Sequence, residues 1–173
     1  MATSEAATPV IAEVPVGVVT VHETVSGNPW INERWRVVGV LAGETLGTTR
    51  GRRSIRRGQD SEEFLWTGLT LRLTPVEADS YYHNLIGRAP AVYVKTQAEN
   101  DGEPIPIQVS IEYIEALAFD EAGNDSHAVP MPPDIYRIVE RFVLEHYVPE
   151  EPRMKRKRDA PSSDDSGHGP RCG

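Results

Sequence analysis

The chain has 173 residues, 39% of them hydrophobic, and a formal net charge of −8 at pH 7. This length predicts one compact domain with tails, and no apolar run reaches the roughly 18 residues that would indicate a membrane span. The small, polar N-terminus does not resemble a secretory signal, and the single Cys172 excludes an internal disulfide and a cysteine-based metal site, so we expect a cytoplasmic protein.

The charges are separated along the chain. Residues 34–57 contain seven arginines and one acid, Glu44. Residues 96–136 contain no lysine or arginine but nine acids. This separation predicts a dipolar surface that steers a charged partner. The overall acidity argues against a nucleic-acid partner, because it opposes a phosphate backbone.

Two strands are expected near the start, after a disordered leader at residues 1–13. Residues 14–24 are apolar on both faces, which is typical of a central strand. An Asn28-Pro29 turn follows, and residues 35–41 then alternate with the period of a strand. Because a short turn region joins them, we expect the two strands to pair antiparallel.

Residues 43–61 interrupt this pattern with four glycines, clustered arginines and almost nothing apolar. They predict a long, mobile, basic loop. Residues 63–73 then show the clearest strand pattern in the chain. Gly68 within it indicates a bulge or a close neighbour.

Two helices and two short strands are expected next. Thr74-Pro75-Val76-Glu77 predicts a capping box, opening a helix that ends at Ile86 and turns Val76, Tyr81 or Tyr82, and Leu85 toward the sheet. Short strands are expected at residues 91–96 and 105–109. A helix over residues 110–119 is expected to bury the stripe Ile111, Ile114 and Ala118.

The last part of the chain predicts an extended connector at residues 127–133 and a helix that begins at Asp134. Its apolar stripe is Ile135, Ile138, Val139, Phe142 and His146. We therefore expect a single domain at residues 14–149 and a disordered basic and polar tail at residues 150–173. The order of elements predicts an α+β fold: an antiparallel sheet or half-open small barrel with two or three packed helices.

Three groups of residues are candidate ligand-binding or partner-binding sites. Trp30 and Trp35 beside Arg34 and Arg36 indicate a core corner or a cation–π clasp. Arg50, Arg52 and Arg53 are suited to grip a phosphate or carboxylate, or else form a solvated loop. The tail carries a basic run that indicates a handle for an acidic partner or RNA, or serves solubility: Lys155, Arg156, Lys157 and Arg158.

No catalytic residue, metal or cofactor is predicted. The five histidines do not show metal-ligand spacing, and no nucleophile lies in a recognisable elbow. Leu41-Ala42-Gly43-Glu44 is similar to the Leu-Ala-Gly-Gly opening of nucleotidyltransferases that attach GMP to molybdopterin. Glu44 replaces the second glycine, which places a negative charge where a phosphate would bind.

Several segments between residues 14 and 159 resemble a bacterial domain family of unknown function that is found beside formate dehydrogenase genes. Its members are sometimes labelled molybdopterin-guanine dinucleotide biosynthesis protein A. The matching segments are Pro15-Val16-Gly17-Val18-Val19, Asn28-Pro29-Trp30, Arg34-Trp35 with residues 38–41, Trp66-Thr67-Gly68 before Leu71, Tyr82-His83-Asn84-Leu85, Pro90-Ala91-Val92-Tyr93-Val94, Val129-Pro130-Met131-Pro132, Phe142-Val143 with His146, and Lys155-Arg156-Lys157-Arg158-Asp159.

This resemblance implies a small cytoplasmic accessory factor for a molybdenum enzyme. We expect a non-enzymatic binding protein that helps mature or assemble a molybdenum-dependent formate dehydrogenase, with a dehydrogenase subunit or a maturation factor as partner. One alternative is nucleotidyl transfer in molybdopterin-guanine dinucleotide biosynthesis, in which Arg50, Arg52 and Arg53 hold phosphate. Another is RNA binding through the basic tail.

Overall fold

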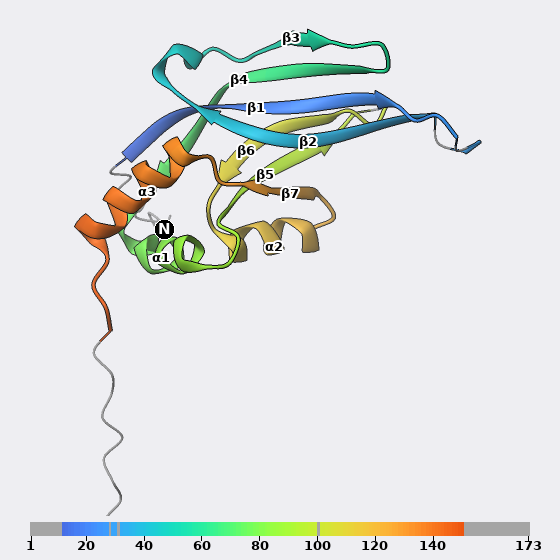
Figure 1. Ribbon diagram of the computed structural model, residues 1–173. Coiled ribbons are helices and arrows are strands. Elements are labelled where there is room, and N and C mark those ends of the chain that lie inside the picture. Colours follow the sequence, from blue (N-terminus) through green and yellow to red (C-terminus); the bar gives the residue numbers. More distant parts are fainter. Residues whose placement is uncertain (1–11, 28, 31, 100, 151–173) are drawn as a thin grey trace, which may run out of the picture.

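The computed structural model describes residues 12–27, 29–30, 32–99 and 101–150 (Figure 1). Four antiparallel strands form sheet A in the order β2-β1-β4-β3: β1 (Ala12–Thr24), β2 (Glu33–Ala42), β3 (Gly51–Arg57) and β4 (Ser61–Leu73). Three antiparallel strands form sheet B in the order β6-β5-β7: β5 (Ala91–Ala98), β6 (Pro104–Ser110) and β7 (Asp125–Pro130).

Three α-helices and two 3₁₀ helices complete the described chain. They are α1 (Ala78–Ile86), α2 (Tyr113–Glu121), α3 (Pro133–His146), η1 (Glu44–Leu46) and η2 (Pro75–Glu77). Neither sheet closes into a barrel among the described residues. The predicted α+β fold is confirmed.

The strand β1 lies at the centre of sheet A, as its two apolar faces predict. It pairs antiparallel with β2 on one side and with β4 on the other. Val16 and Val18 belong to the hydrophobic core, whereas Val19 and Val21 point to the opposite, outer face of the sheet. One strand therefore supplies both the core and the outer surface of sheet A.

The layers are stacked in the order sheet A, sheet B, α2 (Figure 1). Val92 and Val94 of β5 join the core on the inner side of sheet B. On its other side, Lys95 and Tyr93 contact α2 through Glu115 and Tyr113. Helices α1 and α3 pack against each other and close one end of the core, to which they contribute Tyr81, Leu85, Ile135, Val139, Phe142 and Val143.

A bulge in β4 confirms the special role expected of Gly68. Val16 is opposite Leu69 and Val18 is opposite Trp66, so two residues of β4 face the single residue between them on β1. Gly68 has φ +77°, and a Cβ atom there would lie 2.5 Å from the backbone N of Arg50. Only glycine combines this backbone conformation with so close an approach.

The prediction of a long, mobile loop at residues 43–61 is wrong. The segment forms η1 and the strand β3, which pairs with β4 and turns back to it at Gly58, whose N–H donates to the Ser61 carbonyl. Every residue of β3 is exposed, because it is an edge strand. It therefore lacks the apolar alternation by which a strand is recognised.

The expected capping box before α1 is also absent. Thr74 makes no side-chain capping bond, its N–H donates to the Tyr81 hydroxyl, and the first turn is the 3₁₀ helix η2. Tyr81 and Leu85 are buried as predicted, but Val76 is 70% exposed. The tighter 3₁₀ turn places Val76 outside the stripe that an α-helix would bury.

Two later predictions need correction. The helix α2 begins at Tyr113 rather than at residue 110, and Ile114 is 74% exposed, because α2 lies flat on sheet B through Ala116. Residues 127–130 form most of β7 rather than a connector, because they pair with β5. The last helix begins one residue before the expected start and buries Ile135, Val139 and Phe142 as predicted. Residues 1–11 and 151–173 lie outside the described chain.

We predict that Gly68→Ala lowers the free energy of unfolding by more than about 2 kcal/mol, because the substitution adds both backbone strain and a clash with the Thr49–Arg50 backbone. Gly47→Ala, with φ +67° and open space around its Cβ position, should lose only about 1 kcal/mol. Gly39→Ala, with neither feature, should be near neutral. Urea unfolding of the three variants measures these values; equal losses at Gly68 and Gly47 would contradict the close approach.

Candidate functional site

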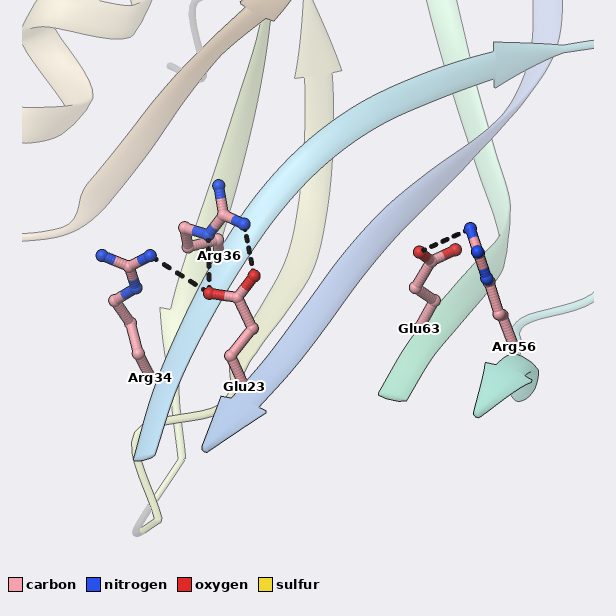
Figure 2. A network of polar contacts seen from close by, with 5 residues as sticks. All are labelled: Glu23, Arg34, Arg36, Arg56 and Glu63. Atoms are coloured by element: carbon pink, nitrogen blue, oxygen red, sulfur yellow. Dashed lines mark hydrogen bonds and ion pairs between the residues drawn. The ribbon is translucent and has the colours of Figure 1, made fainter. Parts of the chain in front are cut away.

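The outer face of sheet A carries a set of arginines that we call the arginine face. It consists of Arg34 and Arg36 on β2, Arg56 on β3, and the carboxylates Glu23 and Glu63 between them (Figure 2), together with Arg53, which the register of β3 places on the same face. The strand register brings them together, because Val21 of β1 is opposite both Arg36 and Glu63, and Glu63 is opposite Arg56. Four guanidiniums against two carboxylates leave this face with a positive charge.

Glu23 holds two of the arginines in place. Its Oε1 accepts a bond of 2.5 Å from the Arg36 guanidinium, and its Oε2 accepts bonds from Arg36 Nε at 3.2 Å and from Arg34 at 3.1 Å (Figure 2). The hydrogen bonds from Arg36 and then Arg34 lower the pKa of Glu23. Glu23 thereby fixes both guanidiniums in an orientation that still leaves them about half exposed.

The other side of the arginine face is held more loosely. Arg56 lies 3.7 Å from Glu63 and is 78% exposed. Among the described residues no carboxylate forms an ion pair with Arg53, which is exposed on the edge strand. These two guanidiniums are available to an external anion.

Apolar side chains lie within and beside the arginine face. Val38, Leu41 and Ile55 are exposed. The 3₁₀ helix η1 covers only the part of β1 near Gly17, where Leu46 approaches the backbone. No other described helix or strand covers this face (Figure 1). Exposed apolar residues bordered by arginine are typical of protein interfaces.

Arg50, Arg52 and Arg53 do not converge on one point. Arg52 points to the inner face, where its guanidinium lies 3.9 Å from the centre of the Phe64 ring and pairs with Glu103 before β6 at 2.5 Å. Arg50 donates to the Pro106 carbonyl of β6 at 2.8 Å. These two arginines fasten sheet A to sheet B, and only Arg53 faces outward.

The two tryptophans of the first hairpin also separate. Trp35 lies on the inner face, opposite to Arg34, stacked on His22 with 4.4 Å between ring centres. Trp30 lies between β1 and β2 and is 90% exposed. Trp35 does not form the cation–π clasp with Arg34 or Arg36, because neighbouring residues of a strand point to opposite faces. Arg52 supplies the cation–π contacts of this sheet, to Phe64 and Trp66.

Two candidate segments remain: the basic tail and the glycine-containing segment at the end of β2. Lys155, Arg156, Lys157 and Arg158 lie outside the described residues. After Leu41 and Gly43 comes the three-residue helix η1, and the Gly43 N–H donates to the Pro15 carbonyl. The strand, loop and long helix that cradle a phosphate are therefore not formed here.

A cleft of about 690 Å³ between β4 and β6 holds carboxyl groups that the sequence did not single out. Burial, followed by the charge of Glu77 and its hydrogen bond to Glu112, raises the pKa of Glu112 to about 7. In the sequence, Glu77 belongs to the predicted capping box and Glu112 to the acidic stretch at residues 96–136, so periodicity could not reveal the pair. Perturbed carboxyl groups in clefts occur at functional sites and in structural networks alike.

A structural network borders this cleft. Lys95 is 4% exposed and donates to Glu115 at 2.7 Å, and the Ser110 hydroxyl donates to the other Glu115 oxygen at 2.7 Å. Burial alone would raise the pKa of Glu115, but the hydrogen bonds from Lys95 and Ser110 outweigh it and lower the pKa. The network anchors α2 to sheet B.

The described residues contain no group of three or more histidine, cysteine, aspartate or glutamate side chains that could hold a metal ion. Their helices include none that is both long enough and apolar enough to cross a membrane.

The fold and surfaces define a small α+β domain of two stacked antiparallel sheets, with an arginine-rich exposed sheet face. Residues 15–158 match the family described as "Protein of unknown function (DUF3305)", and the chain belongs to that family. No curated protein and no solved structure matches the chain. The resemblance to a domain family of unknown function is thereby confirmed.

We predict that Arg52→Gln lowers the free energy of unfolding by about 2 kcal/mol, because it leaves the largely buried Glu103 without its cation. Arg56→Gln, which removes a well-exposed pair, should cost less than about 0.5 kcal/mol. Chemical denaturation measures both. The double variant Arg52→Gln/Glu103→Gln should recover part of the loss, and a fully additive loss would contradict the pairing.

The raised pKa of Glu112 predicts a pH effect of defined sign. Its folded-state pKa of about 7 lies above 4.5, so the folded protein binds the extra proton and its stability falls as pH rises from 4.5 to 7. Glu112→Gln should remove this fall and exceed the wild type by about 1 kcal/mol at pH 8, after allowance for solvent screening of a partly exposed carboxyl. Thermal unfolding at pH 5 and pH 8 measures the difference.

Glu115→Gln is the matched control with the opposite sign. Its pKa is lowered, so its carboxylate stabilises the folded protein above the ordinary glutamate pKa. The variant should therefore be less stable than the wild type at pH 8. A Glu112→Gln variant that is also destabilised at pH 8 would contradict the raised pKa of Glu112.

Proposed function

We propose that this chain is a non-enzymatic accessory protein that binds a partner protein through the arginine face, and that the partner is a subunit or maturation factor of a molybdenum-dependent formate dehydrogenase. The observation that carries the binding role is the uncovered outer face of sheet A, where Arg34, Arg36, Arg53 and Arg56 border exposed apolar residues. On a chain of net charge −8, such a face favours an acidic partner surface.

The way the polar groups are used supports a binding role over catalysis. Arg50 and Arg52 bind groups of the second sheet, and Lys95 and Ser110 bind Glu115. Each of these groups is satisfied by a structural partner. By contrast, Arg53 and Arg56 keep exposed guanidiniums that a partner's carboxylates can engage in paired hydrogen bonds.

The assignment of the partner to formate dehydrogenase rests on the resemblance of the sequence segments, which span nearly the whole domain. An accessory protein of this kind needs only a surface that recognises one conformation of its client. The arginine face fits that requirement because its arginines project from paired strands rather than from a loop, and are therefore largely pre-organised.

We predict that Arg53→Glu/Arg56→Glu abolishes recovery of formate dehydrogenase subunits or maturation factors with the tagged protein, because it places acids opposite an acidic partner surface. The matched control is Arg137→Glu on α3, which reverses an equally exposed arginine elsewhere. Affinity purification from the native host followed by mass spectrometry measures the recovery. The same variants in a deletion strain report formate dehydrogenase activity.

Both readouts have a defined negative result. If the wild-type protein recovers no dehydrogenase component and deletion leaves the activity unchanged, the proposed partner is wrong. If it recovers a component and the arginine variant recovers it equally well, the partner stands and the arginine face is not the binding surface.

A further inference from the structure

A groove between α1 and α2 has exposed apolar residues on both walls. It encloses about 590 Å³, and its walls include Val76 and Ile114, which are mostly exposed, together with Tyr93 and Tyr113. Leu117 continues the apolar surface along the outer side of α2. We call this surface, defined by Val76, Tyr93, Tyr113, Ile114 and Leu117, the α1–α2 groove. It lies on the opposite side of the molecule from the arginine face (Figure 1).

The charges around the groove favour a basic occupant. Glu77 and Asp79 line it, and Glu112 lies beside Glu77. The basic side chains at the groove are Arg88 and His83, and the latter lies 3.5 Å from Asp79. A segment that combines an apolar side chain with several cations would complement this surface.

The chain itself contains such a segment, and the residues that lead to it pass beside α1. After α3, the ring of Tyr147 stacks on Tyr82 of α1 with 4.5 Å between centres. Tyr82 is followed by His83, which lines the groove. Seven residues follow Tyr147 up to and including Met154, and they span at most about 25 Å when extended, about twice the roughly 10–12 Å width of a helix. Met154 is followed directly by Lys155, Arg156, Lys157 and Arg158.

We propose that residues 154–158 of this chain bind the α1–α2 groove, with Met154 against Val76 and Ile114 and the four cations beside Glu77, Asp79 and Glu112. The basic run is then held within the molecule and becomes accessible to other binding partners only on release from the groove. Because the association is intramolecular, a short connection gives the segment a high effective concentration.

Paramagnetic relaxation tests this proposal on the full chain. Cys172 is the only cysteine, so Cys172→Ser/Asp159→Cys places a single nitroxide label directly after the basic run. We expect strong broadening of amide signals in α1 and at residues 113–117, and none in β3 on the opposite layer. Raising NaCl from about 0.05 M to about 0.5 M should reduce the broadening, because screening weakens the ionic contacts. Unchanged α1 and α2 signals would overturn the proposal.

Two further arms define what occupies the groove. In a mixture of isotope-labelled chains without nitroxide and nitroxide-bearing chains without isotope label, we expect no broadening. Broadening in that mixture would show that a second copy supplies the segment, which overturns the intramolecular assignment. Ile114→Lys should restore the signals to their diamagnetic intensity, and it is compatible with folding because Ile114 is mostly exposed. The control Leu144→Lys, on the equally exposed part of α3, should leave the broadening intact.

Discussion

The structure depends on the pairing of β1 with β2 and β4, which buries one face of β1 and leaves the other at the surface. Val16 and Val18 enter the core, while Glu23 on the opposite face belongs to the arginine face. A slip of one residue would exchange the two sets. The register of β1 therefore determines both the stability of the domain and the position of its charged outer surface. The bulge at Gly68 sets the register of β4 against β1 on the two sides of Gly17.

The same alternation gives adjacent arginines different tasks. Arg52 and Arg53 follow each other on β3, yet Arg52 lies over Phe64 and pairs with Glu103, whereas Arg53 points outward on the edge of the sheet. The guanidinium of Arg52 is partly desolvated and stabilises the contact between the sheets. The guanidinium of Arg53 is exposed and is available to bind a partner. A cluster of arginines in a sequence is thus divided by the strand that carries it.

How much could be predicted from the sequence follows from what each element buries. β1, β4 and α3 bury a regular apolar face, so their periodicity predicts them. β3 buries no side chain and is held by backbone pairing to β4, which leaves no trace in the pattern of residues. The Glu77–Glu112 pair joins residues of η2 and of the segment before α2, which only the folded chain brings together at the cleft between β4 and β6. Of the candidate site, the sequence indicated the arginines, but only the register shows which of them face outward.

The order of layers explains how one small domain presents two opposite charges without mutual neutralisation. The arginine face covers the outer side of sheet A, and the acids of α2 lie on the outer side of sheet B, so two stacked sheets separate them. Packed sheets lie about 10 Å apart, which is at least the screening length at physiological salt. The acidic partner proposed for sheet A and the basic segment proposed for the α1–α2 groove would therefore occupy separate surfaces and need not compete. Through this stacking, the charge segregation along the chain becomes a separation in space between two charged surfaces.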